Sequence, residues 1–408
     1  MNSSIPNENG RRRRRRPTSS SDVIAFPAMV ALSFVFSYIV FALIVMDSKA
    51  RDKLLDLSAG KKILITGASA GIGLAAVDNL YGHHNGPDLV IMGCRSMDKC
   101  EKARMDIITK YSKDKAKCNR NSEEKVCRAF PTELICLELD LARNQSVRKF
   151  AKEVNGVLKR WNGGRKKKTS LDILINNAGV AGPPTESVRE AAELTMQINH
   201  YGHFLLTSLM MPSLLASEKG GRVVNVSSLA GYLWMPQFLY KILPSGLSNP
   251  NNYDPADPQF EKVLCAYEQS KRANLLFTNA LQERFGGIHN FTAVASHPGY
   301  SRTSLPLTGF RFAPENFRKF FAYNPVMSMS SDAGSLTTLK AALDLGKVSG
   351  GKFVGPIFGA IGRPVVIGTS LNPFLAFDKV TAGDGKQSVD ILWDHSEQVV
   401  GEKFFRAK

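Results

Sequence analysis

Short apolar runs alternate with longer amphipathic stretches through most of the chain. The runs at 62–66 and 222–226 are rich in Ile, Leu or Val, which predicts buried β-strands. The stretches at 147–158 and 189–215 predict helices. This alternation is typical of an α/β fold, so we expect residues 60–408 to form a single domain with a Rossmann-type doubly wound parallel sheet. The expected strands are residues 62–66, 89–93, 134–139, 171–175, 222–226, 291–296 and 352–354.

Three polar segments interrupt this pattern and are expected to be insertions. They are residues 110–128, 161–169 and 235–258, the last of which is rich in Pro and Asn. Trp234, Phe238 and Tyr240 precede the Pro/Asn-rich part, and two roles are open for them: lining an apolar pocket, or packing beneath a long loop.

The N-terminal region contains one long apolar run. Residues 1–22 are polar and Arg-rich and are expected to be disordered. Residues 23–46 are uncharged and mostly apolar, and 24 residues suffice to span a bilayer. The alternatives are a cleaved signal peptide, whose apolar region is shorter, and a buried helix, which would be amphipathic. We therefore predict a single transmembrane anchor.

The charges beside this anchor bear on its orientation. Six arginines at 11–16 outweigh Lys49, Arg51 and Lys53 on the other flank, which by the positive-inside rule places the body in the lumen. The opposite orientation, with the body in the cytosol, also remains open. We expect a single-pass membrane protein of the endoplasmic reticulum, with a plastid membrane as the alternative.

The chain is strongly basic, with a formal net charge of +17, most of it outside the N-terminal tail. Such a body favours anionic partners: a phosphorylated cofactor, anionic lipids or nucleic acid. The basic residues form scattered clusters such as 165–168, without interleaved aromatic residues. We therefore predict membrane lipids but no nucleic acid as a partner. A homo-oligomer is compatible with the sequence.

The cysteines and histidines show no metal-binding pattern. None of the six cysteines forms a Cys-x-x-Cys pair or has a histidine at metal-ligand spacing, so we expect free thiols, with a disulfide as the alternative, and no metal site. His200, His203 and His297 fall near the expected site, where packing or hydrogen bonding is their expected role.

A glycine-rich segment follows the first predicted strand and opens a helix. It reads Thr66-Gly67-Ala68-Ser69-Ala70-Gly71-Ile72-Gly73. Gly67 would permit a tight turn, Gly71 would let a pyrophosphate approach the backbone, and Gly73 would allow close packing. A dinucleotide phosphate would then lie on the free N–H groups of the helix. A purely structural turn is the alternative.

Tyr267 and Lys271 are spaced to share one face of a helix. An ammonium there is expected to lower the phenol pKa toward the range useful for proton transfer. Tyr111 and Lys115 have the same spacing, but in a Lys-rich run that predicts a solvated loop.

Arg95 follows the second predicted strand, where NAD-selective folds place an acid that binds the ribose. A guanidinium suits the 2′-phosphate of NADP instead, and the strand end Gly93-Cys94-Arg95-Ser96 contains no carboxylate. We therefore predict NADPH/NADP+ as the cofactor. The alternative is an ordinary surface arginine.

The order of these motifs resembles the short-chain dehydrogenase/reductase superfamily, in particular its membrane-associated retinol-dehydrogenase-like and protochlorophyllide-reductase-like members. The resemblance includes Asn176-Asn177-Ala178-Gly179, Asn225-Val226-Ser227-Ser228 and Pro298-Gly299. It implies that Asn199 holds a water that relays protons to Lys271, and that Ser228 orients a substrate oxygen. It also places Asp140 on the adenine side, although capping of the next helix is an equal alternative.

The predicted site has a catalytic and a cofactor-binding part. The catalytic residues are Asn199, Ser228, Tyr267 and Lys271. The cofactor-binding residues are Gly67, Ser69, Gly71, Ile72, Gly73, Arg95, Asp140, Asn177, Ala178, Gly179, Tyr267, Lys271, Pro298, Gly299 and Thr303.

The predicted function is NADPH-dependent reduction of a carbonyl, with Tyr267 as proton donor. The insertion at 235–258 and the Phe-rich segment 304–331 suggest a bulky apolar small-molecule substrate: a retinoid, a steroid or a long-chain aldehyde or ketone. A protochlorophyllide-type double-bond reductase is one alternative. A non-catalytic NADPH-binding membrane adaptor is another, although an adaptor has no need for the complete catalytic set.

Overall fold

The computed structural model describes most of the chain after residue 47. The described residues are 48–118, 132–161, 169–185, 187–228, 259–302, 328–359, 361–367 and 377–407, with side chains for all of them except 113–118, 188, 259–265 and 377–387. They belong to a compact unit that runs from Met46 to Lys408. None of the described helices is both long and apolar enough to cross a membrane. The predicted tail at 1–22, anchor at 23–46 and insertion at 235–258 lie outside the described residues.

An eight-stranded sheet forms the centre of this unit, with strand order β3-β2-β1-β4-β5-β6-β7-β8. The strands are β1 (Lys62–Thr66), β2 (Leu89–Cys94), β3 (Glu133–Glu138), β4 (Ile173–Asn176), β5 (Arg222–Val226), β6 (Thr292–Ser296), β7 (Phe353–Pro356) and β8 (Pro364–Val366). Strands β1 to β7 pair in parallel, which confirms the seven predicted strands and the parallel sheet. Strand β8 is antiparallel to β7 and was not predicted, because it has only three residues and begins with a proline at the sheet edge.

Both faces of the sheet are buried, which explains why its strands are continuously apolar. In β1, Leu64 belongs to one hydrophobic core, and Ile63 and Ile65 belong to the other. Successive side chains of a strand point to opposite faces, so the two cores lie on the two sides of the sheet.

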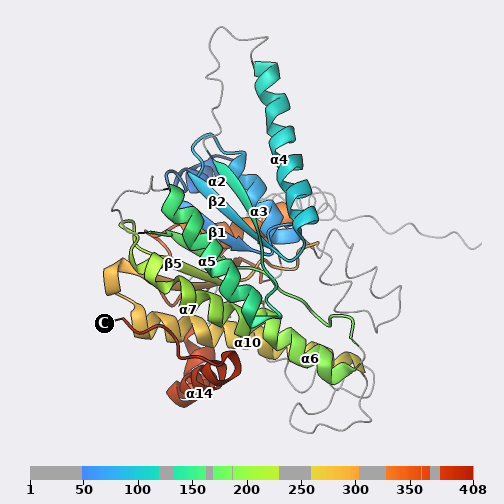
Figure 1. Cartoon of the computed structure of the whole chain (residues 1–408), viewed down its shortest axis with the longest axis vertical. Coiled ribbons are helices and arrows are strands. Elements are labelled where there is room, and N and C mark those ends of the chain that lie inside the picture. Colours follow the sequence, from blue (N-terminus) through green and yellow to red (C-terminus); the bar gives the residue numbers. More distant parts are fainter. Residues whose placement is uncertain are drawn as a thin grey trace, which may run out of the picture. The chain divides into compact units, whose positions relative to one another are not determined.

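Helices cover both faces (Figure 1). They are α2 (Ser48–Asp56), α3 (Gly71–Tyr81), α4 (Met97–Cys118), α5 (Asn144–Trp161), α6 (Val188–Met196), the π-helix η1 (Gln197–Tyr201), α7 (Gly202–Leu215), α10 (Gln259–Phe285), the 3-10 helix η2 (Ile288–Asn290), α13 (Ser331–Leu343) and α14 (Phe377–Val400). One core joins α5, α7, α10 and α14, for example through Phe150 and Phe277. The other joins α2, α3, α4 and α13, for example through Val77 and Leu339.

The C-terminal segment closes the first core. Trp393 of α14 lies with its ring 4.5 Å from that of Phe404 and 5.1 Å from that of Phe204 in α7. The backbone N–H of Phe405 donates to Ser208 Oγ at 2.9 Å. These contacts fix the last residues of the chain on the surface formed by α7 and α10.

The helix predicted at 189–215 is present over residues 188–215, but it is not regular. The π-helical turn η1 separates α6 from α7 and carries Asn199. Turns of this kind are rare and often occur at functional sites.

Tyr111 lies in a helix, so the predicted solvated loop at this position is wrong. The residue belongs to α4 and is half-buried, with its ring 5.8 Å from that of Tyr81 and its hydroxyl donating to the Asp78 carbonyl at 3.3 Å. The contact between the Tyr111 and Tyr81 rings therefore stabilises this turn of α4 as a helix, although the residues that follow are polar. Of the other two predicted insertions, most of 161–169 and all of 235–258 lie outside the described residues.

Cys94 and Cys100 form a disulfide, with their Cα atoms 6.0 Å apart. Cys94 ends β2 and Cys100 lies in the first turns of α4, so the short connection between these elements brings the two sulfurs together. For this pair the disulfide alternative holds and the expectation of free thiols is wrong. Cys136 is free and buried, and burial raises the pKa of its thiol to about 12.

Arg222 is fully buried at the start of β5. Its Nε donates to the Ala341 carbonyl in the last turn of α13 at 2.7 Å, and one Nη donates to the Val348 carbonyl, also at 2.7 Å. The other Nη donates to Thr292 Oγ1 at 3.1 Å. Burial lowers the pKa of Arg222 to about 10, so the guanidinium remains charged at neutral pH. It therefore caps the carbonyl end of α13 from inside the protein.

Candidate active site

The predicted site residues gather at the carboxyl edge of the sheet. The glycine loop follows β1, Asn177 follows β4, Ser228 follows β5 and Pro298 follows β6. Parallel strands all end at this edge. The strand order changes direction between β1 and β4, which is the place where folds of this kind bind a ligand.

The glycine loop has the geometry of a phosphate-binding turn. Gly67 has φ +66°, and a Cβ there would lie 2.8 Å from the Ala178 Cα. A Cβ on Gly73 would lie 2.6 Å from the Asn177 amide nitrogen and would also contact the Gly67 carbonyl, so this position must stay small. At the start of α3, Ala70 provides no side-chain cap. The first N–H groups of the helix are therefore suited to an anion, and these residues fit a dinucleotide.

Thr66 ties the glycine loop to the end of β4. Its Oγ1 accepts hydrogen bonds from the backbone N–H groups of Asn177 and Ala178, each at 2.9 Å. The Asn177 side chain donates back to the Thr66 carbonyl at 2.8 Å. His203 Nε2 lies 2.9 Å from the same Oγ1. Burial lowers the pKa of His203 to about 3, which keeps this imidazole neutral in a hydrogen-bonding role.

Asn199 holds the backbone beside Lys271. Its Oδ1 accepts from the Val180 N–H at 2.8 Å, while its Nδ2 donates to the Val180 carbonyl and to Ser270 Oγ, both at 2.9 Å. A Cβ on Gly179 would lie 3.2 Å from Lys271 Nζ and 3.4 Å from Asn199 Oδ1. Gly179 thus lets the β4 loop pass between the two side chains.

Ser227 and Ser228 have different environments. Ser227 is buried and its hydroxyl donates to the Lys271 carbonyl at 2.7 Å, which is a structural role. Ser228 is partly exposed and forms a side-chain hydrogen bond with Tyr267. The structure therefore brings the second serine of the pair, and not the first, to the phenol.

The electrostatics of Tyr267 differ from the expectation based on spacing. Burial raises the pKa of its phenol to about 12, against a smaller lowering by the hydrogen bond with Ser228. Lys271 Nζ lies 5.6 Å from the centre of the phenol ring and donates to the Val226 carbonyl at 3.1 Å. Burial also lowers the pKa of Lys271 to about 8. In this structure the loss of hydration therefore outweighs the attraction between ammonium and phenolate.

Two predicted cofactor residues lie at the ends of neighbouring strands. Arg95 follows β2 and is exposed, and none of the described ion pairs includes it. It is next to the glycine loop, because the Gly67 N–H donates to the Gly93 carbonyl at 2.8 Å. Asp140 accepts from the Ala142 N–H at 3.1 Å and pairs with Arg143 at 2.8 Å, so it stabilises the turn before α5.

The remaining predicted residues lie around the start of α3. Ile72 is buried in its first turn, and Ser69 is half-buried in the preceding loop. A Cβ on Gly334 of α13 would lie 2.9 Å from Ile72 Cδ1 and 2.9 Å from the Pro298 carbonyl, which places the loop after β6 beside α3. Gly299 follows with φ +70°. Thr303 lies outside the described residues.

The sequence is similar to those of known dehydrogenases. The family described as short chain dehydrogenase matches residues 61–240. Retinol dehydrogenase 13 of Mus musculus is 31% identical over 308 residues, which covers 72% of this chain and 76% of that protein. Short-chain dehydrogenase TIC 32 A, chloroplastic, of Brassica napus is 33% identical over 303 residues, which covers 71% of this chain and 78% of that protein. The chain belongs to the short-chain dehydrogenase/reductase family.

Two further proteins are similar to this chain. Human retinol dehydrogenase 14 is 36% identical over 251 residues, which covers 61% of this chain and 64% of that protein, so less than two thirds of that relative is matched. Among solved structures, a putative uncharacterized protein from Mycobacterium paratuberculosis is 29% identical, with a TM-score of 0.52 over 85% of this chain and 95% of its own.

Three residues of this short-chain dehydrogenase/reductase hold the site together without having been predicted: Thr66, Ser270 and Gly334. Thr66 was visible as the last residue of a strand and the first of the glycine-rich segment, and Ser270 only as a polar residue between Tyr267 and Lys271. Their partners are far away in sequence, so no local pattern marks them.

Proposed function

We propose that the protein is an NADPH-dependent oxidoreductase that reduces a carbonyl group of a bulky apolar substrate. The observation that carries this proposal is the hydrogen bond between Ser228 and Tyr267, with the Lys271 ammonium 5.6 Å from the phenol ring centre. A hydroxyl and a phenol that touch each other can both donate to one carbonyl oxygen. Membership of a family that typically binds NAD(P) supports the cofactor class.

Each of these side chains has a defined part in the proposed reaction. Bound NADPH would supply the hydride for the carbonyl carbon. With a pKa of about 12, Tyr267 is protonated at neutral pH and is therefore a proton donor for the carbonyl oxygen. The Lys271 charge would stabilise the phenolate that remains, and Ser228 would orient the oxygen.

The preference for NADPH rests on Arg95. We expect Arg95→Ala to weaken NADPH binding by about 1–3 kcal/mol, because a charge-assisted contact to the 2′-phosphate is lost, and to leave NADH binding almost unchanged. Fluorescence titration of both cofactors measures the two effects. Arg104→Ala, a neighbouring arginine paired with Glu101, is the control and should change neither. Equal losses for NADPH and NADH in Arg95→Ala would exclude recognition of the 2′-phosphate.

The proposed substrate class is a retinoid, a steroid or another long apolar aldehyde or ketone. It is supported by the similarity to proteins named retinol dehydrogenases. The test is to incubate membranes that contain the full chain with NADPH and a panel of retinals, ketosteroids, long-chain aldehydes and protochlorophyllide, in light and in darkness. Oxidation of NADPH with an apolar carbonyl in darkness supports the proposal. Turnover of protochlorophyllide alone in light, or of nothing, contradicts it.

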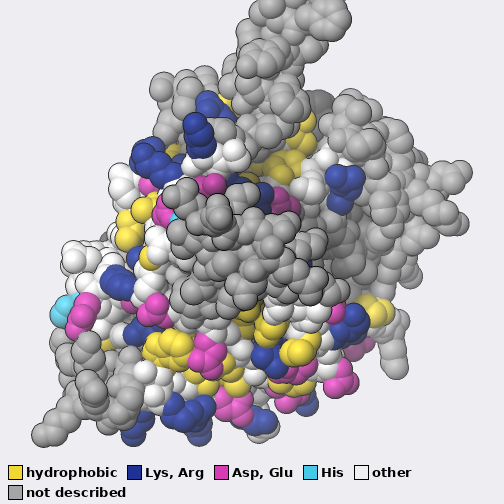
Figure 2. Space-filling model, turned by 90° about the horizontal axis from the view of Figure 1, so that it is seen from above, with side chains coloured by type: hydrophobic (Ala, Val, Ile, Leu, Met, Phe, Trp, Pro, Cys, Tyr) yellow, Lys and Arg dark blue, Asp and Glu magenta, His cyan; other side chains and the backbone are white. Residues whose placement is uncertain are grey.

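Besides the substrate, membrane lipids are the proposed partner of this chain, and nucleic acid is not. On the face in Figure 2, the described Lys and Arg side chains are interspersed with Asp and Glu. Among the described residues, basic side chains form ion pairs with carboxylates, such as Lys102 with Asp106 at 3.0 Å and Arg189 with Glu193 at 2.8 Å. Nucleic-acid binding favours a continuous basic stripe instead.

The proposed anchor at 23–46 makes a separate prediction. The full chain should resist carbonate extraction from membranes, because an apolar segment of this length stays in the bilayer, whereas a chain that starts at Arg51 should be released. Protease digestion of sealed vesicles then reports the side of the body. Protection without detergent would agree with the luminal orientation that the positive-inside rule favours, and digestion would place the body in the cytosol. Release of the full chain by carbonate would contradict an anchor.

A further inference from the structure

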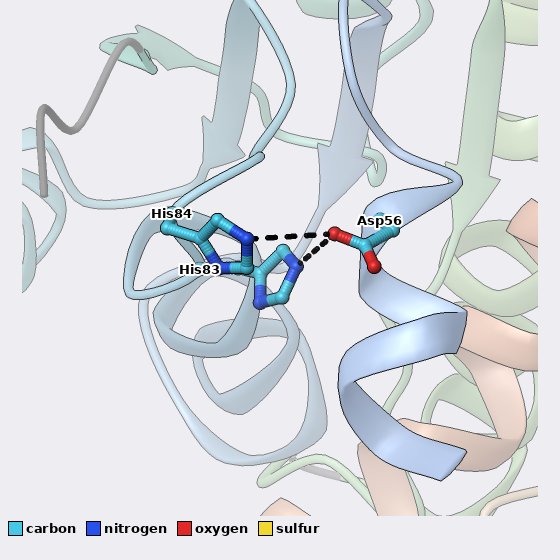
Figure 3. A group of neighbouring side chains, drawn as sticks. All are labelled: Asp56, His83 and His84. Atoms are coloured by element: carbon cyan, nitrogen blue, oxygen red, sulfur yellow. Dashed lines mark hydrogen bonds and ion pairs between the residues drawn. The ribbon is translucent and has the colours of Figure 1, made fainter. Parts of the chain in front are cut away.

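Three side chains of types that can bind metal ions meet away from the predicted active site (Figure 3). Asp56 is the last residue of α2, and His83 and His84 lie in the loop between α3 and β2. Asp56 Oδ1 is 2.9 Å from His83 Nε2 and 3.8 Å from His84 Nε2. One ligand atom from each of the three residues lies within 4.8 Å of those of the other two.

We propose that Asp56, His83 and His84 form a binding site for a divalent transition-metal ion, with zinc as the ion that fits best. Zinc binds imidazole nitrogen and carboxylate oxygen at about 2.0–2.2 Å, so two ligands of a tetrahedral site lie about 3.3–3.6 Å apart. The two oxygen–nitrogen separations of 2.9 and 3.8 Å lie on either side of this range. Changes of a few tenths of an ångström would bring these two separations into the range.

The chemistry of the ligands selects the class of ion. Two imidazoles and one carboxylate suit zinc, cobalt or nickel, whereas magnesium and calcium prefer sites made of oxygen ligands. Three protein ligands leave a fourth position for water.

One of the three side chains is buried and the other two are exposed to solvent. The His83 side chain is 4% exposed, which fixes one imidazole in the protein. Asp56 is 44% exposed and His84 51%, so an ion can enter from solvent.

A hydrogen bond between His83 and Asp56 would by itself explain the positions of these two side chains. It does not explain His84, whose Nε2 is too far from Asp56 for a hydrogen bond yet faces the same oxygen (Figure 3). The two imidazole rings lie side by side, with their centres 4.5 Å apart. Both imidazoles therefore present a nitrogen to one carboxylate oxygen.

The position of the site indicates a structural role. The loop with His83 and His84 precedes β2, so it lies at the amino edge of the sheet, opposite the edge with Tyr267. Helix α2 is also held by the buried Leu54 and Leu55 and by Arg51, which forms an ion pair with Asp332 at 3.2 Å and a hydrogen bond with Asn79. A metal ion at Asp56 would fix the other end of this helix to the body.

The test is zinc binding by the full chain, prepared without a polyhistidine tag and stripped of metal with a chelator. Isothermal titration with zinc chloride should show one ion per chain. Changing groups around a zinc site costs about 10–100-fold in affinity, so loss of a ligand in His84→Gln or Asp56→Asn should weaken binding by at least about 100-fold. Both side chains are substantially exposed, so these variants should fold, which circular dichroism checks. His289→Asn removes an exposed histidine outside the cluster and should bind zinc like the unchanged chain.

Two controls exclude other zinc ligands. Alkylation of the thiols should leave the single binding event unchanged, because the proposed ligands contain no sulfur. Cobalt should give the visible absorption of nitrogen and oxygen ligands, without a thiolate charge-transfer band. The proposal is overturned if zinc does not bind, if binding is lost on alkylation, or if His84→Gln and Asp56→Asn bind zinc as tightly as His289→Asn.

Discussion

Replacing Tyr267 with Phe should lower turnover by about 10²–10⁴-fold while NADPH binding stays nearly unchanged. The substitution removes one hydroxyl, which is the proton donor in the proposed reaction and the hydrogen-bond partner of Ser228. The aromatic ring remains, so its packing near Lys271 is kept. Steady-state kinetics with the best substrate of the panel, together with fluorescence titration of NADPH, separate the two effects.

Tyr111→Phe is the matched control for this experiment, because Tyr111 has the same spacing to a lysine. Its hydroxyl donates to the Asp78 carbonyl at 3.3 Å in a region that contains none of the predicted site residues. This variant should retain full turnover. Substantial activity in Tyr267→Phe would mean that another group donates the proton, whereas equal losses in both variants would point to a general effect on folding.

Replacing Arg222 with Met should lower the free energy of unfolding by about 3–5 kcal/mol. The methionine fills part of the same space but leaves the carbonyls of Ala341 and Val348 without the donors that they have at 2.7 Å. Each buried acceptor without a partner costs about 1–3 kcal/mol. Urea unfolding followed by tryptophan fluorescence measures the change, with the buried Trp393 as one reporter.

Arg189→Met is the control for the loss of an arginine. Arg189 pairs with Glu193, and both side chains are largely exposed, so this change should cost less than about 1 kcal/mol. Arg222→Lys should give an intermediate loss, because a lysine keeps the charge but cannot reach all three acceptors at once. A cost below about 1 kcal/mol in Arg222→Met would show that water satisfies these carbonyls.

The strands could be predicted because a buried parallel sheet imposes an apolar pattern along each of its strands. The predicted bounds of β1 and β5 agree with the structure, and the others differ by one or two residues. Strand β8 has no such pattern, since it lies at the edge and is three residues long. Tyr111 was misplaced because the polar residues beside it obscured the apolar contact with Tyr81.

The site could be predicted as a set of motifs but not as a network. Gly67 and Gly73 follow from the strand-turn-helix pattern, and the structure gives each a close neighbour that excludes a side chain. The bonds from Asn199 to Val180 and Ser270 join residues 19 and 71 positions apart, which no local spacing indicates. The raised pKa of Tyr267 depends on burial, which spacing alone does not give. The cluster of Asp56, His83 and His84 was missed for the same reason, because its carboxylate is 27 positions away from His83.

The π-helical turn at Gln197–Tyr201 limits which insertions and deletions this part of the chain can tolerate. A π-turn contains one residue more than the α-helix on either side of it. Deletion of a single residue within η1 would restore a regular α-helix and keep α6 and α7 nearly in phase, but it would remove the bulge that sets the directions of the side chains at 197–201. Asn199 would then no longer meet Val180 and Ser270, even with Phe204 in its place beside Trp393. Length variation between homologues should therefore be absent from residues 197–201 and be tolerated more readily in the loops that join the strands to the helices.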